Sequence, residues 1–286
     1  MNVLLFAGLT LRELMRRRLV AAVALLSLVI AAFTAWGMHH LATAVVDGAP
    51  LPEPAVRAAA AGIVILLAFL FSFVVALGAA LVGAPAMAES IANGEVLAVL
   101  ARPVRRADVV LGRWLGTLAA LAFYVAAAGT LELLVVRATT GYVPPQPLLA
   151  LAYLSAVGGI VTTGAIALAT RLPALAAGIV AAMLFGLGWI GGILESIGLA
   201  LGNTRLADAG TIVALVFPSD ALWRGALYAL QPAAFTAAAA NINGSGTGIN
   251  PFAVTSPPPQ AILWWAFAWT VAVLAAGVAL FRTRDL

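Results

Sequence analysis

Two carboxylates stand inside long apolar runs of this sequence, where an ionisable group is costly. Glu132 lies in the run 114–136 and Glu195 in the run 174–197. A charged side chain at the centre of a membrane helix costs about 2.5–3.5 kcal/mol, which makes such residues functional candidates. Both could line the outer part of a translocation path. Both also fall near one end of their run, so each could instead be an interfacial carboxylate paired with Arg137 or another loop arginine.

The residue types that bond chemistry needs are largely missing. The chain has no Cys, which excludes disulfides, thiolate metal sites and a Cys nucleophile. All 15 basic residues are Arg, so a phosphate-binding loop of the form GxxxxGK[ST] is excluded. His39 and His40 are adjacent and cannot share a helical face. We therefore expect no catalytic residues, no metal and no cofactor in this chain, and any ATP dependence would have to come from a partner.

Composition indicates the setting in which these residues lie. The 286 residues are 64% hydrophobic and 9% charged, with a mean hydropathy of +1.09, whereas soluble domains carry about 25% charged residues. The net charge of +4 does not indicate a nucleic-acid partner, because the Arg residues flank hydrophobic runs, as topology-setting residues do. The sequence predicts an all-α polytopic protein in the lipid bilayer of the cell (plasma or inner) membrane.

Six runs are long enough to cross about 30 Å of hydrocarbon as helices. Lipid offers the backbone no hydrogen-bond partners, so each crossing segment must be helical. The predicted spans are 19–41, 58–83, 114–136, 148–170, 174–197 and 261–281. Together they form one six-helix transmembrane domain over residues 19–286.

Arginine placement predicts that both termini are cytoplasmic. The segments placed inside hold 11 of the 15 Arg residues, namely Arg12, Arg16, Arg17, Arg18, Arg102, Arg105, Arg106, Arg113, Arg171, Arg282 and Arg284. The other four, Arg57, Arg137, Arg205 and Arg224, lie outside. The inverted topology would leave only four inside.

Three segments outside the spans have their own patterns. Residues 1–18 predict an interfacial helix, because Leu4, Ala7, Leu11, Leu14 and Met15 recur at helical spacing. A cytoplasmic loop is predicted over 85–113, with a short helix that Pro103 ends. An external segment is predicted over 198–260, with a capped helix at 219–230 and an apolar run at 211–217 too short to cross.

The loop carries a motif that resembles the permease subunit of ABC-2 type transporters, the membrane part of an ATP-binding-cassette exporter. The matching positions are Glu89, Gly94, Leu97, Leu100, Pro103, Arg106, Gly112 and Arg113. The chain end 281–286 and the stretch 217–224 are also similar to that family. Glu95 stands where many members have Thr.

The resemblance implies a dimer of two such permeases, or of a permease and a homologue, above two cytoplasmic ATPase subunits. The loop would be a coupling helix seated in the ATPase. The contact residues implied are Glu89, Gly94, Glu95, Val96, Leu97, Leu100, Arg102, Pro103, Arg105, Arg106 and, from the 171–173 link, Arg171. Transport would be conformational, and the apolar path favours a hydrophobic or amphipathic substrate.

Two alternatives belong to other classes. The chain could be a mechanical transmitter that couples a cytoplasmic ATPase to an external envelope partner, because the step 101–103 resembles permeases of nitrous-oxide-reductase maturation transporters. A secondary carrier predicts ionisable residues near the bilayer midplane, and the sequence places none there. The chain has 27 Gly residues, so chance GxxxG matches are common, and the Gly188–Gly192 pair indicates only close helix packing, such as a dimer seam.

Overall fold

The computed structural model describes residues 2–16, 18–46, 48–94, 105–237 and 254–284. This part of the chain contains six helices long and apolar enough to cross a membrane. They are α2 (Arg18–Ala42), α3 (Glu53–Ala92), α5 (Arg106–Thr140), α6 (Pro147–Ala169), α7 (Ala174–Ala200) and α11 (Gln260–Arg282). Each overlaps one predicted span, which confirms an all-α multi-pass membrane protein.

The predicted loop 85–113 is too long at both ends. Helix α3 continues through Pro85 to Ala92, and α5 already begins at Arg106. Proline removes one backbone donor, but a membrane helix tolerates this where its neighbours pack closely. The flanking residues Ala84 and Met87 are completely buried. Packing of this stretch therefore keeps it helical where the sequence suggested a break.

The N-terminal segment is helical, as predicted, and packs against α5. Helix α1 (Asn2–Met15) approaches α5 at Gly112 and Gly116, where an added Cβ would collide with Phe6 and Thr10 respectively. The predicted apolar stripe is wrong in part, because Leu4 is 75% exposed and the buried face contains Phe6 and Thr10. The two glycines of α5 select this face, since they leave room for close backbone approach. That α1 lies at the membrane surface stays a prediction.

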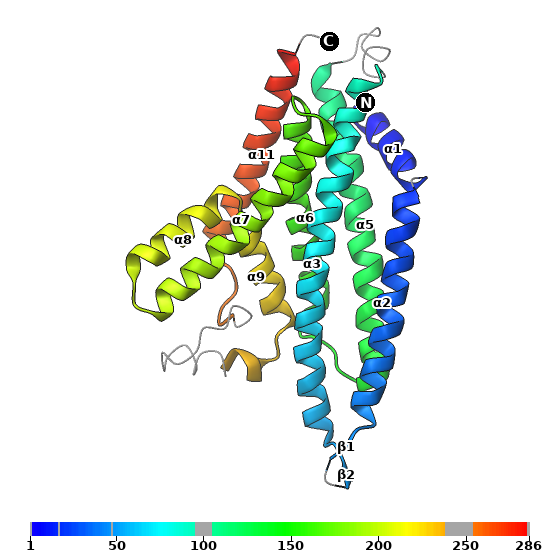
Figure 1. Cartoon of the computed structure of the whole chain (residues 1–286), viewed down its shortest axis with the longest axis vertical. Helices are drawn as coiled ribbons and strands as arrows, with labels where there is room; N and C mark the ends of the chain where they lie inside the picture. Colours follow the sequence, from blue (N-terminus) through cyan, green and yellow to red (C-terminus); the bar gives the residue numbers. More distant parts are fainter. Residues whose placement is uncertain (1, 17, 47, 95–104, 238–253, 285–286) are drawn as a thin grey trace.

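Helix α6 lies at the centre of the bundle. It contacts α3, α5, α7 and α11 (Figure 1), and its residues Val157, Val161 and Ala165 are completely buried. At the opposite end from α1, a short antiparallel ribbon of β1 (Val45–Val46) and β2 (Ala49–Pro50) joins α2 to α3. Gly48 makes this turn with a φ of 79°.

The segment after α7 folds back along α7 and then packs against α6. That it lies outside the membrane stays a prediction. Helix α8 (Thr204–Val216) returns along α7, and α9 (Ser219–Leu230) then turns by 97° and runs down against α6 (Figure 1). The bent pair α8–α9 would add a seventh crossing if counted as one span. The predicted helix at 219–230 is confirmed, although the structure shows no side-chain cap at its start.

Glycines allow this fold-back. A Cβ added to Gly198 of α7 would collide with Ala207 of α8, and one added to Gly210 of α8 would collide with the Glu195 backbone of α7. The Gly188–Gly192 pair likewise faces residues 217–220 of its own chain. Its close packing is thus inside one subunit.

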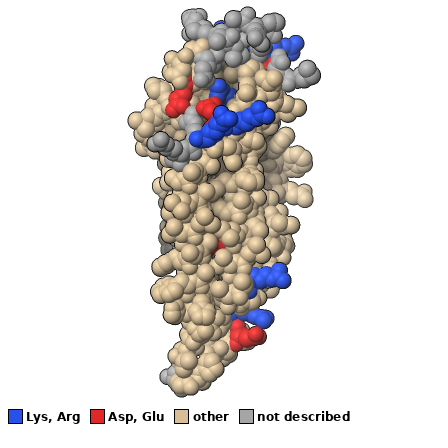
Figure 2. All heavy atoms as spheres, turned by 90° about the vertical axis from the view of Figure 1, so that its right-hand side faces the viewer, with Lys and Arg blue, Asp and Glu red and all other residues tan. Residues whose placement is uncertain are grey.

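The two ends of the molecule differ in charge. Helix α1 and the C-terminal end of α11 lie at the same end (Figure 1), as an even number of crossings requires. Figure 2 shows charged side chains near both ends of one face and, between them, a broad surface with only one small acidic spot. Of the described arginines, the terminal end holds Arg12, Arg16, Arg105, Arg106, Arg113, Arg171, Arg282 and Arg284. Which end faces the cytoplasm stays a prediction.

Candidate functional site

An ion-paired cluster joins α7 to α9. The Arg224 Nε atom lies 2.7 Å from Asp220 Oδ2, and Nη2 lies 3.1 Å from Glu195 Oε2. Nη2 also donates to the Gly192 carbonyl at 2.6 Å, and the Thr211 hydroxyl of α8 donates to Glu195 Oε1 at 3.1 Å. The Arg224 guanidinium therefore joins α9 to α7 directly, and Glu195 extends the cluster to Thr211 of α8.

This cluster gives Glu195 a structural partner. Its side chain is 28% exposed and Arg224 is 30% exposed, while that of Asp220 is only 8% exposed. Removing one partner from a buried pair is strongly destabilising, because it leaves an uncompensated charge. The geometry fits the paired interpretation of Glu195, with Arg224 as the arginine. The i, i+4 spacing of Asp220 and Arg224 was the sequence signal for this pair.

Glu132 lies on α5 and faces α2. The Thr34 side chain, 7% exposed, is its hydrogen-bonding neighbour on α2. The Glu132 Oε1 atom is buried without a hydrogen-bond partner in the described part of the chain. No ion pair between described residues joins Glu132 to Arg137. Glu132 and Glu195 are thus on different helix pairs and do not form one site.

Helix α11 holds the break between α8 and α9. The last carbonyls of a helix have no partner within it. The Trp265 indole donates to the Leu215 carbonyl at 3.0 Å, and the Trp269 indole donates to the Val216 carbonyl at 2.9 Å. Both acceptors are in the last turn of α8. These two bonds tie the fold-back to the last span.

The far end of α9 is held in the same way. The Tyr142 hydroxyl donates to the Leu230 carbonyl at 3.0 Å, and the Gln146 backbone N–H donates to the Ala229 carbonyl at 3.0 Å. Burial raises the pKa of Tyr142 to about 12. The hydroxyl therefore stays protonated, and remains a donor, at physiological pH.

The terminal end of the bundle has an arginine clamp, formed by Arg106, Arg171 and Arg284. Arg106 Nη1 donates to the carbonyls of Phe281, Arg282 and Arg284 at 3.0, 2.9 and 2.8 Å, which satisfies the open C-terminal turn of α11. Arg171 donates to the Thr283 hydroxyl, and Arg284 donates to the Thr170 carbonyl. The clamp joins the start of α5, the α6–α7 link and the end of α11.

The expected ATPase contacts are distributed around this clamp. Arg106 and Arg171 belong to it, Arg105 directly precedes Arg106 and is exposed, and Glu89 is exposed near the end of α3. Gly94 follows the last turn of α3 with a φ of 71°, a conformation that favours glycine. The remaining expected contacts, Glu95, Val96, Leu97, Leu100, Arg102 and Pro103, lie outside the described residues.

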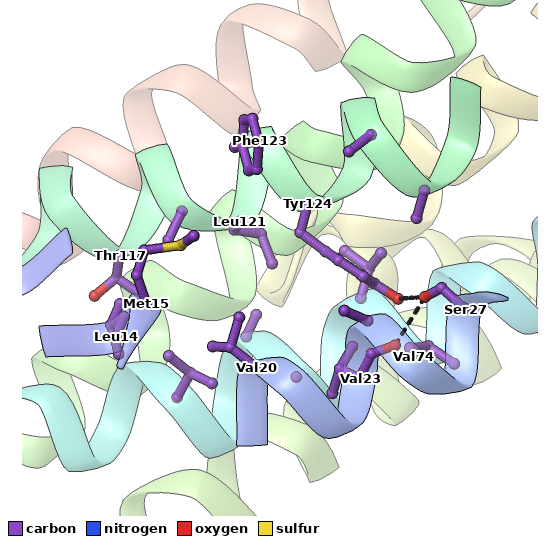
Figure 3. Close-up of a pocket in the computed structure, with 18 of the residues that line it drawn as sticks. Leu14, Met15, Val20, Val23, Ser27, Val74, Thr117, Leu121, Phe123 and Tyr124 are labelled. Carbon is purple, nitrogen blue, oxygen red and sulfur yellow. Dashed lines mark hydrogen bonds between the residues drawn. The ribbon is translucent and has the colours of Figure 1, made fainter. Parts of the chain in front are cut away.

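A cavity of about 390 Å³ lies between α2, α3 and α5, beneath the end of α1 (Figure 3). Its lining is aliphatic and aromatic except for the hydroxyls of Ser27, Thr117 and Tyr124. Ser27 Oγ donates to the Val23 carbonyl and lies 2.9 Å from the Tyr124 hydroxyl. Such a space is within the size range of small-molecule sites, about 300–1,000 Å³. Neither this cavity nor the clamp was predicted from the sequence.

No group of three or more His, Asp or Glu side chains among the described residues could hold a metal ion. A scan against models of known protein families finds no match for the chain, and a search of curated proteins finds no match either.

Proposed function

We propose that this multi-pass membrane protein is the permease subunit of an ATP-driven exporter of the ABC-2 type. Two copies, or a copy and a homologue, would enclose the substrate path, and two separate ATPase subunits would bind the terminal end. ATP and Mg would be bound by those subunits, since this chain has no Lys for a phosphate-binding loop. The substrate would be hydrophobic or amphipathic.

The observation that carries the proposal is the organisation of the terminal end. The start of α5, which follows the α3–α5 connection, and the α6–α7 link meet at the arginine clamp together with the end of α11. Both the connection and the link are expected to contact an ATPase. At its other end, α11 holds the break in the α8–α9 fold-back through Trp265 and Trp269. A pull on the α3–α5 connection would therefore reach the opposite half of the bundle through one rigid helix. This supports conformational coupling.

The test is co-purification of the tagged chain with ATP-binding-cassette ATPases from its own organism. We compare the wild type with a Val96→Asp, Leu100→Asp double variant. The matched control is Val45→Asp, Val46→Asp, which changes two exposed valines at the other end of the molecule. We expect an ATPase to bind the wild type and the control and to be lost from the loop variant.

The outcomes separate the proposal from its alternatives. Failure of every ATPase to bind the intact protein would remove the permease assignment and favour a carrier, with Glu132 as the first residue to test. If an ATPase binds, stimulation of its activity by a lipophilic substrate alone would indicate export. Stimulation only in the presence of an external protein would indicate the mechanical transmitter.

A further inference from the structure

We propose that the cavity between α2, α3 and α5 binds one acyl chain of an anionic membrane lipid that stays with the protein. This inference depends only on the chain being a multi-pass membrane protein, and not on the proposed export function. It assigns an occupant to a cavity that neither Glu132 nor Glu195 lines.

The residues at the opening of the cavity indicate that it opens toward the lipid bilayer. Met15, Leu28 and Phe123 line the cavity and are 53%, 56% and 64% exposed. Leu28 and Phe123 belong to spanning helices, so their exposed sides face lipid tails in a membrane. Figure 3 shows the cavity extending along the helices, from Leu14 and Met15 at one end to Ser27 at the other. A flexible chain from the adjoining bilayer fits this elongated shape.

The hydrogen-bond inventory favours an apolar occupant. A hydroxyl has one proton to donate. The Ser27 proton goes to the Val23 carbonyl at 2.9 Å, so Tyr124 is the donor in its 2.9 Å contact with Ser27. The Thr117 hydroxyl donates to the Arg113 carbonyl at 2.8 Å. All three hydroxyl protons at the cavity are therefore used within the protein, and a ligand that needs donors would find none there.

The charge near one end of the cavity favours an anionic headgroup. Arg12 and Arg16 are exposed near the end of α1, within two positions of the cavity residues Leu14 and Met15. Neither arginine forms an ion pair with a described residue. A phosphate at the membrane surface attracts such arginines, while its chain passes beneath α1 into the cavity.

The experiment fills the cavity with a side chain. Gly78 of α3 lines the cavity, and a Cβ added there meets no atom within 4 Å. Gly78→Leu therefore occupies the space without a backbone clash. The matched control is Gly62→Leu on the same helix, where a Cβ also meets no atom within 4 Å but Gly62 does not line the cavity.

The full-length variants are reconstituted in vesicles of phosphatidylcholine and phosphatidylglycerol that carry a trace of phosphatidylglycerol with a diazirine in mid-chain. After illumination, labelled residues are mapped by mass spectrometry. Trp264, which is 69% exposed outside the cavity, reports ordinary contact with bulk lipid. In the wild type we expect cavity residues to be labelled above the level at Trp264. We expect Gly78→Leu to lose about tenfold of the cavity label, equivalent to about 1.4 kcal/mol, while Gly62→Leu keeps it.

Three results would overturn the inference. One is equal labelling of the cavity and Trp264 in the wild type, and another is an unchanged cavity label in Gly78→Leu. The third is cross-linking between two copies of the chain through the cavity residues, which would make a second subunit the occupant.

The headgroup is tested by the double variant Arg12→Gln, Arg16→Gln. This variant should keep labelling by the acyl chain but lose the preference for the phosphatidylglycerol probe over a phosphatidylcholine probe. Equal labelling by both probes in the wild type would refute the anionic assignment.

Discussion

Gly192 is the position where the α7–α8–α9 fold-back is most sensitive to one added methyl group. In Gly192→Ala, the new Cβ would overlap the Asp220 carboxylate, well within the 3.0 Å that real Cβ contacts respect. The carboxylate cannot retreat freely, because it is 2.7 Å from Arg224 and its side chain is only 8% exposed. The substitution therefore either displaces Asp220 from Arg224 or separates α7 from α9.

Both outcomes lower the free energy of unfolding. Overpacking a close-packed site costs about 1–3 kcal/mol, and loss of the ion-pair partner adds to it. We expect about 3 kcal/mol, which for chains of 150–250 residues corresponds to roughly 6–12 °C in the unfolding midpoint. Gly186→Ala is the control on the same helix, since its Cβ meets no atom within 4 Å. There, better helix propensity should leave the midpoint unchanged or raise it.

Thermal unfolding of the purified protein in detergent, followed by tryptophan fluorescence, measures both variants. A double-mutant cycle identifies the colliding group. In an Asp220→Ala background, which is itself destabilised, Gly192→Ala should cost less than about 1 kcal/mol, because the carboxylate is gone. Full additivity of the two substitutions, or a Gly192→Ala variant as stable as the wild type, would refute the reasoning.

Two further predictions concern α11. Arg106→Gln removes the charged donor to three carbonyls of the last turn, so amide hydrogen exchange of residues 278–284 should accelerate by about tenfold or more; unchanged exchange would show that the clamp contributes nothing. Trp269→Phe leaves the Val216 carbonyl without its indole donor and should cost about 1 kcal/mol, with faster exchange across α8. Trp264→Phe, at an exposed indole, is its control, and equal effects in both would contradict a specific role for the Trp269 bond.

The spans were predictable because a long apolar run in lipid has one backbone solution, a helix. The ends of the spans were less predictable. Pro85 suggested a break after residue 83, but the surrounding packing keeps α3 helical to Ala92. In the same way, no local pattern after residue 198 predicted that α8 returns along α7, where glycines allow the close approach.

Some of the site residues could likewise be predicted from the sequence, and others could not. Glu132 and Glu195 stood out because their charge was visible against an apolar background. Their partners were not visible, since Thr34 and Arg224 are brought to them by helix packing. The arginine clamp was even harder to predict from the sequence, because Arg106 and its acceptors are more than 170 positions apart in the chain. The cavity arises from the gap between three helices, so no local pattern in the sequence encodes it.

The unequal lengths of the central helices have a consequence for the surrounding bilayer. Helix α6 has 23 residues, about 34 Å at 1.5 Å per residue, which is close to the hydrocarbon thickness. In α3, residues 58–88 carry no charge, a run of about 46 Å. Such hydrophobic mismatch is relieved by tilting or by local thickening of the bilayer, at a fraction of a kcal/mol per Å. The protein should therefore be sensitive to lipid chain length, with longer acyl chains favoured beside α3.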